Sequence, residues 1–349
     1  MTGPLIIDVE GFALTAEEKE RLAHPWVGGV ILFTRNFDSI EQVTELVRSI
    51  HAIRPGAGQG SERLLVSIDH EGGRVQRFRR GFTHLPSFRV LAQALERAGD
   101  ASAPAGETVM KAIQAARLAG IQLAAELRGI GVDFSYTPVL DLDYGRSEVI
   151  GDRSFHRSPA WVSLMAGAMM QGLSLSGFKN CGKHFPGHGW AQADSHHDLP
   201  VDERDLESIL RDDCLPYAEL AAAPQLNDGS WGPALLTAVM PAHVRYPQVD
   251  DSPAGFSSVW IREILRERLG FDGVVISDDL SMAGAAIYED VADRAQAAFE
   301  AGCDATLICN RPDLAVRALD EMPKRMPQFL NSSDRRGLGR LMPHATAPQ

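Results

Sequence analysis

Eight short runs of mainly apolar residues recur along the 349-residue chain, separated by longer segments. The runs are Leu5–Val9, Gly29–Phe33, Leu64–Ile68, Val132–Thr137, Asn180–His184, Leu235–Met240, Gly273–Ser277 and Ala305–Cys309. Short runs that stay apolar without alternation are typical of strands in a parallel sheet, because helices cover both faces of such a sheet. The pattern therefore predicts eight parallel strands.

The segments between the runs carry helical patterns. Thr15 opens one with the capping sequence Thr-Ala-Glu-Glu, and Ser39–Ile53 places its apolar residues on one helix face. Further helices are expected over Glu107–Gly129, Pro159–Leu173, Ser257–Leu269, Asp290–Gly302 and Asp313–Met322. Repetition of strand and helix predicts an α/β fold, a (β/α)8 TIM-type barrel, with a doubly wound open sheet as the alternative.

The domain organisation is expected to be simple, because no break in composition divides the chain. Residues 1–330 are interpreted as one barrel domain, and residues 331–349 as a polar, poorly ordered tail. Gly56–Gly60 is interpreted as a loop tip, and Pro224–Pro233 as an exposed insertion before the sixth strand.

Charge and hydropathy narrow the classes of partner. The formal net charge is −12, so no basic surface is available for nucleic acid or an anionic membrane. The chain has no apolar run long enough to span a bilayer, and Asp8 and Glu10 interrupt its first apolar run, which is unlike a signal peptide. We therefore expect a cytoplasmic protein.

Four cysteines occur, Cys181, Cys214, Cys303 and Cys309, and no pair forms a C-x-x-C motif. This spacing is not that of a disulfide framework in a secreted protein. We interpret them as reduced packing residues in a reducing compartment.

Polar residues follow most of the predicted strands. They are Asp69, His70 and Glu71 after the third strand, Asp141 after the fourth, Lys183, His184 and His188 at the fifth, His243 after the sixth, Asp278 and Asp279 after the seventh, and Asn310 after the eighth. The carboxyl ends of all strands meet at one rim of a barrel, where active sites of this fold lie. These side chains are therefore expected to share one site.

Cleavage of a glycosidic bond requires one group that attacks or stabilises the anomeric carbon and another that protonates the leaving oxygen. Asp278 is the first candidate because it directly follows an apolar strand, whereas Asp279 should point elsewhere and cap a helix or accept a hydrogen bond. The second candidate is His196, which Asp194 could orient as a general acid and base. For the isolated Asp-Ser-His tripeptide, a solvated polar loop remains the alternative.

A metal site is the competing interpretation of the histidines. His184, His188, His196 and His197, with Asp69 or Asp278, could bind a metal as in TIM-barrel amidohydrolases. No H-x-H follows an early strand, however, and Lys183 lies beside His184. We therefore expect no metal and no cofactor.

Five segments together carry a family resemblance. They are Ile68–Arg77 (IDHEGGRVQR), Gly151–Phe155 (GDRSF), Gly182–Gly189 (GKHFPGHG), Asp194–His196 (DSH) and Ile276–Met282 (ISDDLSM). In these segments the chain resembles glycoside hydrolase family 3, and specifically its short, single-domain bacterial β-N-acetylhexosaminidases of peptidoglycan recycling. Two departures are His70, where related enzymes usually have Gln, and the loop sequence Trp190-Ala191-Gln192-Ala193.

The resemblance implies a role for each matched position. Asp278 would be the nucleophile, and His196 the acid/base with Asp194 completing the dyad. The sugar-binding set would be Asp69, Arg77, Arg153, Lys183 and His184. The family gives Glu71 no role, so we assign it none.

The activity implied is hydrolysis of terminal, non-reducing β-linked N-acetylglucosamine with net retention, from GlcNAc-1,6-anhydro-MurNAc fragments with or without peptide. The partner would be this small carbohydrate, and we expect the protein to act as a monomer. The alternatives are a related exo-β-glucosidase or xylosidase, a metal-dependent amidohydrolase, and a sugar-binding protein without turnover.

Overall fold

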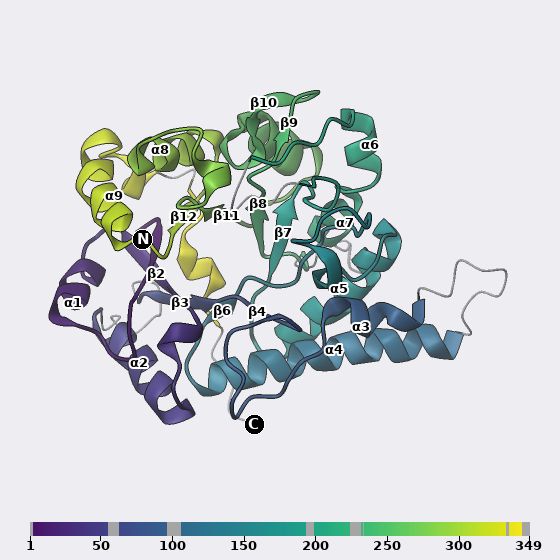
Figure 1. Ribbon diagram of the computed structural model, residues 1–349, viewed down its shortest axis with the longest axis horizontal. Coiled ribbons are helices and arrows are strands. Elements are labelled where there is room, and N and C mark those ends of the chain that lie inside the picture. The colour runs from purple at the N-terminus through teal and green to yellow at the C-terminus, as the bar shows by residue number, and fades with distance from the viewer. Residues whose placement is uncertain are drawn as a thin grey trace.

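The computed structural model describes residues 3–54, 63–95, 106–192, 199–223, 232, 234–332 and 335–343. Its central sheet has eight parallel strands, β1 (Leu5–Asp8), β2 (Val27–Leu32), β3 (Leu65–Ile68), β6 (Phe134–Ser135), β7 (Cys181–Phe185), β8 (Ala238–Pro241), β11 (Val274–Asp279) and β12 (Ala305–Ile308). Their order is β6-β3-β2-β1-β12-β11-β8-β7, and parallel bridges from Phe134 to Lys179 and from Val139 to Lys183 close the ring. The predicted single-domain TIM-type barrel is confirmed (Figure 1).

Helices surround the ring of strands. They are α1 (Ala16–Leu22), α2 (Ile40–Ala52), α3 (Phe88–Ala92), α4 (Gly106–Gly129), α5 (Pro159–Leu175), α6 (Leu206–Arg211), α7 (Leu215–Ala221), α8 (Val291–Ala301) and α9 (Pro312–Arg325), with a π-helix over Val259–Arg268. The predicted cap of α1 is confirmed, since Thr15 and Glu18 exchange side-chain to backbone hydrogen bonds. Helices α3, α6 and α7 were not predicted. Pro216 starts α7 as a new helix, which leaves α6 and α7 with short periodic patterns.

The strand boundaries differ most from the expected ones in the fourth and sixth strands. The fourth strand is only Phe134–Ser135, since Pro138 follows closely and has no N–H for a sheet hydrogen bond. The sixth strand begins at Ala238, not at Leu235. Two antiparallel ladders were not anticipated, β4 (His70–Gly72) with β5 (Val75–Gln76), and β9 (Arg245–Tyr246) with β10 (Asp250–Pro253).

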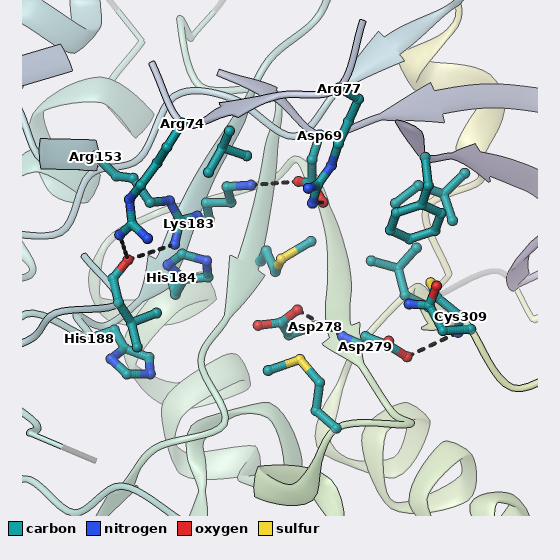
Figure 2. Close-up of a pocket in the computed structure, with 18 of the residues that line it drawn as sticks. Asp69, Arg74, Arg77, Arg153, Lys183, His184, His188, Asp278, Asp279 and Cys309 are labelled. Atoms are coloured by element: carbon teal, nitrogen blue, oxygen red, sulfur yellow. Dashed lines mark hydrogen bonds and ion pairs between the residues drawn. The ribbon is translucent and has the colours of Figure 1, made fainter. Parts of the chain in front are cut away.

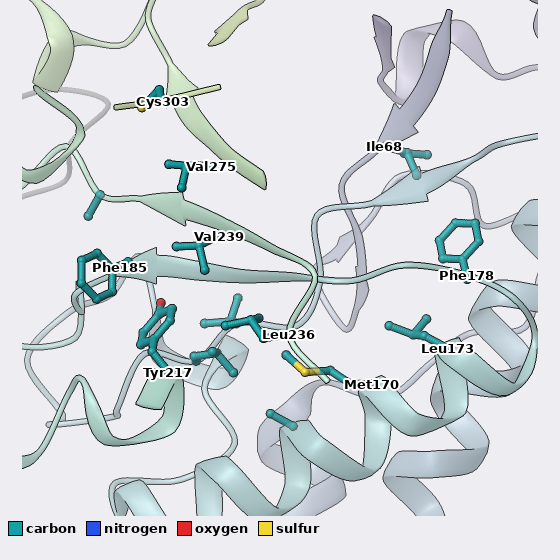
Figure 3. Packing of buried hydrophobic residues seen from close by; sticks show 14 of the residues in the cluster. Ile68, Met170, Leu173, Phe178, Phe185, Tyr217, Leu236, Val239, Val275 and Cys303 are labelled. Carbon is teal, nitrogen blue, oxygen red and sulfur yellow. The ribbon is translucent and has the colours of Figure 1, made fainter. Parts of the chain in front are cut away.

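The strands are apolar throughout because both of their faces are buried. In β1, Leu5 and Ile7 pack in the outer core between sheet and helices, whereas Ile6 lies in the barrel interior. In β11, Val275 faces outward and Val274 and Ile276 face inward. Figure 3 shows Val239 and Val275 on their strands, with the side chains of Tyr217 and Met170 in the same buried cluster.

The C-terminal segment corrects one expectation. Residues 335–343 do not form a poorly ordered tail. They include a short 3-10 helix, Leu338–Leu341, whose two leucines are fully buried in the interior cluster together with Met342 and the strand residue Ile6. The backbone N–H of Arg336 also donates to the Asp304 carboxylate at 2.8 Å. Three closely spaced apolar side chains therefore close the amino-terminal end of the barrel, although the segment as a whole is polar. Residues 344–349 lie outside the described part.

Three further expectations concern the cysteines, two loops and membrane spans. All four cysteines are buried and none forms a disulfide, as predicted. The Gly56–Gly60 loop tip lies outside the described residues, as does the insertion except for Gly232. No helix in the described ranges has both the length and the apolar character needed to cross a bilayer.

His70 is an ionisable group held in an apolar setting. Its side chain is 1% exposed and its ring lies near those of Phe78 and Phe82, at centroid distances of 6.4 and 6.2 Å. Its Nδ1 has no hydrogen-bond partner among the described residues. Burial lowers the pKa of His70 to about 4 from an ordinary 6.5, so the folded protein keeps this imidazole neutral.

The buried tail predicts a stability effect. Leu341→Ala should lower the free energy of unfolding by about 2–5 kcal/mol, because it leaves a cavity in the barrel interior. Met110→Ala, at a residue 62% exposed on α4, is the matched control and should change the free energy by less than about 0.5 kcal/mol. Urea denaturation followed by circular dichroism measures both. Equal, small effects for the two variants would contradict the proposed packing.

The environment of His70 predicts a pH effect. Below pH 6.5 the unfolded chain protonates this imidazole while the folded chain does not, so stability is lost as the pH falls from 6.5 to about 4. His70→Gln should remove this component. Between pH 7.5 and 4.5, its free energy of unfolding should fall less than that of the parent chain, by about 2.5 kcal/mol. An identical fall in both proteins would show that His70 is protonated in the folded state.

Candidate active site

A pocket of about 710 Å³ opens at the carboxyl ends of the strands. Its lining includes residues from the ends of six strands, namely Phe33, Asp69, Lys183, Met240, Asp278 and Asn310. Asp141 and His243, also expected at this rim, are buried beside it and contact residues of the lining. The polar strand ends predicted to share a rim thus gather at one site (Figure 2), except His70, which packs against Phe78 and Phe82 and does not line the pocket.

Strand alternation explains which side chains reach the pocket. Leu65, Cys181 and Ile276 face the barrel interior on β3, β7 and β11. Side chains two residues apart share a face of a strand, so Lys183 and Asp278 continue the inward sets of their strands, as Asp69 does four residues after Leu65. The apolar interior positions therefore fix the direction of the polar side chains that follow them.

Asp278 and Asp279 take different directions at the end of β11. The Asp278 carboxylate projects into the pocket and accepts the N–H of Asp279 at 2.8 Å (Figure 2). The Asp279 carboxylate accepts from the backbone N–H groups of Ser281 and Cys309 at 2.9 and 3.0 Å, and from the Ser281 hydroxyl at 2.7 Å. The expected hydrogen-bonding role of Asp279 is confirmed.

The two carboxyl groups also differ in acidity. Burial alone would raise the pKa of Asp278, but His243, His184, the Asp279 N–H and the Lys183 ammonium favour its charged form, and the pKa is lowered. Burial raises the pKa of Asp279 to about 6, assisted by the neighbouring charge of Asp278. At neutral pH the pocket therefore holds Asp278 as an anion.

Lys183 is the central cation of the site. Its ammonium Nζ lies 2.7 Å from Asp69 Oδ1 and 2.7 Å from Glu71 Oε1, and its side chain is 3% exposed. Burial would lower the pKa of Lys183, but the two carboxylates outweigh it and the pKa is raised. Arg77 contacts the other oxygen of Asp69 at 3.5 Å. The pKa of Asp69 is lowered because Lys183 and Arg77 outweigh its burial.

Glu71, to which the sequence assigned no role, lies beside the predicted sugar-binding residues. Its carboxylate is 2% exposed and accepts two hydrogen bonds from Arg153, from Nε at 2.9 Å and from Nη2 at 2.8 Å. Burial would raise its pKa, but Arg153 and Lys183 hold it well below the usual range. One signal was available, because Glu71 lies two residues after Asp69 in the same strand-end segment and so could share its direction.

His184 is oriented by a buried carboxylate. Its Nδ1 lies 2.7 Å from Asp141 Oδ2, and the backbone N–H groups of His184 and His188 donate to the same carboxylate at 3.2 and 2.7 Å. Burial would raise the pKa of Asp141, but His184 outweighs it and the pKa is lowered. With Nδ1 held by Asp141, the free ring nitrogen of His184 is Nε2, and His184 lines the pocket.

Comparison with known proteins identifies the family. The sequence model that defines the glycosyl hydrolase family 3 N-terminal domain matches residues 5–335 of this chain. The chain belongs to glycosyl hydrolase family 3. A β-hexosaminidase of Bordetella avium is 52% identical over 347 residues, which cover 99% of this chain and 90% of that protein. This family 3 member is a β-hexosaminidase, a glycoside hydrolase.

Solved structures of the family give the same fold. Native NagZ from Neisseria gonorrhoeae aligns with a TM-score of 0.82 at 45% identity, covering 99% of this chain and 91% of that one. The same protein has been solved with N-trifluoroacetyl-D-glucosamine, and that structure aligns with a TM-score of 0.79 at 44% identity, covering 97% and 91% of the two chains. The relatives thus include one that binds an N-acylated glucosamine.

The acid/base pair expected in this family 3 enzyme, Asp194 and His196, lies in residues 193–198, outside the described part. The chain on both sides of these residues is anchored. The Trp190 ring contacts Tyr144 at a centroid distance of 5.1 Å, and the Arg204 guanidinium lies 4.6 Å from its centroid. Gln192 lines the pocket.

Within the described ranges, no group of three His, Cys, Asp or Glu side chains is arranged to hold a metal ion.

Proposed function

We propose that the chain hydrolyses terminal, non-reducing β-linked N-acetylglucosamine with net retention, using Asp278 as nucleophile and His196, paired with Asp194, as acid/base. The observation that carries the proposal is the ionised Asp278 carboxylate, which projects into a pocket walled by Lys183 and His184. A half-buried anion beside cationic and hydrogen-bonding groups suits attack on an anomeric carbon.

The reaction has two displacements. In the first, an Asp278 oxygen forms a bond to C1 while the C1–oxygen bond to the leaving group breaks, and protonated His196 gives its proton to that oxygen. In the second, neutral His196 removes a proton from water, the water oxygen bonds to C1, and the Asp278 carboxylate is released. Each step inverts C1, so the product keeps the β configuration. Asp194 orients the imidazole and favours its charged form.

Chain connectivity supports the role of His196. Gln192 lines the pocket and His196 follows it by four residues, so their Cα atoms lie at most about 14 Å apart. A histidine side chain spans several ångströms more. This connectivity allows His196 to reach the pocket that Gln192 lines.

The sugar would be held by Asp69, Arg77, Arg153, Lys183 and His184. The ammonium of Lys183 has three N–H groups and its two carboxylate contacts use two of them, which leaves one for a hydroxyl. The contacts of Arg153 to Glu71 and to the Val149 carbonyl likewise leave N–H groups unused. Groups of this kind discriminate strongly, because a buried polar partner left unpaired costs about 1–3 kcal/mol.

We further propose that the natural substrates are GlcNAc-1,6-anhydro-MurNAc fragments, with or without peptide, turned over in the cytoplasm by a monomer without a cofactor during cell-wall recycling. The complex of the Neisseria relative with N-trifluoroacetyl-D-glucosamine supports the N-acylated sugar. Comparing 4-nitrophenyl β-GlcNAc with the β-glucoside and β-xyloside tests the sugar preference. Faster cleavage of the glucoside or xyloside would contradict it, and loss of activity with EDTA would contradict a metal-free reaction.

Removal of the nucleophile predicts loss of turnover. Asp278→Ala should lower kcat on 4-nitrophenyl β-GlcNAc by at least about 10³-fold. Asp304→Asn is the matched control. It also neutralises a carboxylate, but Asp304 is buried before β12, at the opposite end of the barrel. It should lose stability and keep kcat within about threefold. Proton NMR of the first product of the parent enzyme should show the β anomer, and the α anomer would contradict the double displacement.

The acid role of His196 predicts a dependence on the leaving group. His196→Ala should lower kcat/KM by about 10²–10⁴-fold for a β-GlcNAc glycoside with an alkyl leaving group, which needs a proton to depart. The loss should be much smaller for the 2,4-dinitrophenyl glycoside, whose leaving group departs as an anion. An equal loss on the two substrates would exclude a role as general acid.

A further inference from the structure

The geometry points to Glu71 as a positioning residue of the sugar pocket, one that acts through Lys183 and Arg153 without touching the substrate. The inference rests on the proposed function, in which these two cations bind the sugar. Glu71 itself lies behind the residues that line the pocket, since its side chain is 2% exposed and is absent from the lining.

Three distant parts of the chain meet at the Glu71 carboxylate. Glu71 lies on β4, Lys183 on β7, and Arg153 at the end of the 3-10 turn Gly151–Arg153. Glu71 Oε1 lies 2.7 Å from Lys183 Nζ and 2.8 Å from Arg153 Nη2, and Oε2 lies 2.9 Å from Arg153 Nε. Both carboxylate oxygens are engaged, and both cations are held by charge-assisted hydrogen bonds.

These contacts settle which N–H groups remain for the sugar. A planar guanidinium bound through Nε and Nη2 cannot rotate, so its remaining N–H groups have one direction. The flexible Lys183 side chain is fixed in the same way by Glu71 and Asp69. The donors are therefore placed before the sugar arrives, which reduces the entropy lost on binding.

Glu71 also supplies the counter-charge for the cations. Asp69 is shared by Lys183 and Arg77, whereas among the described residues Glu71 provides the carboxylate that contacts Arg153. Without it, the buried Lys183 ammonium and the half-buried Arg153 guanidinium would lie close together, and the nearest remaining carboxylate, Asp69, contacts Lys183 and has a side chain that is 22% exposed. Repulsion would displace their side chains from the positions that the sugar requires.

The matched test variant is Glu71→Gln, which keeps the size of the side chain. Its amide nitrogen would face N–H donors of Arg153 or Lys183, so one oxygen contact would become a donor-to-donor clash. Glu71→Asp keeps the charge with a side chain one methylene shorter and should retain more activity. Glu18→Gln is the control: Glu18 is also a buried glutamate, 3% exposed, but it belongs to the cap of α1.

The experiment measures kcat and KM for β-GlcNAc glycosides with 4-nitrophenyl and alkyl leaving groups. Glu71→Gln should lower kcat/KM by about 10–100-fold, by the same factor on both substrates, because it acts on the sugar side. Glu18→Gln should lower Tm but keep kcat/KM. In the double variant with Lys183→Met, the Glu71→Gln change should cause a smaller loss than it causes in the parent enzyme, since part of its effect passes through Lys183.

Three results would overturn the inference: kcat/KM of Glu71→Gln within twofold of the parent enzyme, a full additive loss in the double variant, or a loss confined to one leaving group. If Glu71→Gln does not fold, the same comparison of single and double variants is made with Glu71→Asp in its place. A parent enzyme that does not cleave β-GlcNAc glycosides would instead overturn the proposed function, so the two failures are distinguishable.

Discussion

The buried ammonium of Lys183, shared by two carboxylates, is the interaction on which the site depends. Its contacts at 2.7 Å join β7 to the segment that follows β3, across the mouth of the barrel. Loss of one partner of a buried ion pair typically costs about 3–5 kcal/mol, because a charge is left without compensation. The same ammonium helps to keep the pKa of Asp278 low. One cation thus joins the architecture of the pocket to the charge of the nucleophile.

The barrel makes this arrangement possible. A closed ring of parallel strands directs every carboxyl end to one rim, and apolar interior residues on each strand fix the direction of the polar residues that follow. Asp69, Lys183 and Asp278 lie far apart in the sequence and reach the same pocket for this reason. A second layer of buried carboxylates, Glu71 and Asp141, then holds Arg153 and His184 in place.

Local sequence patterns predicted the helices and strands more fully than they predicted the contacts between them. The eight apolar runs identified the eight strands, and the strand after Gly273 placed Asp278 in the pocket. The pairing of His196 with Asp194 made this histidine a candidate, but only the family resemblance favoured it over a solvated loop. The role of Arg153 came from the resemblance alone, because a single arginine carries no local signal.

Three features were not accessible from the sequence for physical reasons. Glu71 bonds to Arg153, which is 82 residues away, and nothing in the local sequence indicates that pairing. The Leu338–Leu341 turn is a small apolar island in a polar segment, so average composition concealed it. Helices α6 and α7 were not predicted, because Pro216 at the start of α7 separates them and each is too short to show a clear period.

The central claim is that a sugar held by Lys183 and its neighbours is attacked by Asp278. A crystal structure after reaction with a slowly hydrolysed 5-fluoro N-acetylglucosaminyl fluoride tests it most directly. The account predicts a covalent bond from C1 to an Asp278 oxygen, with sugar hydroxyls within hydrogen-bond distance of Lys183 and Arg153. A bond to any other residue, or a sugar bound outside this pocket, would contradict it.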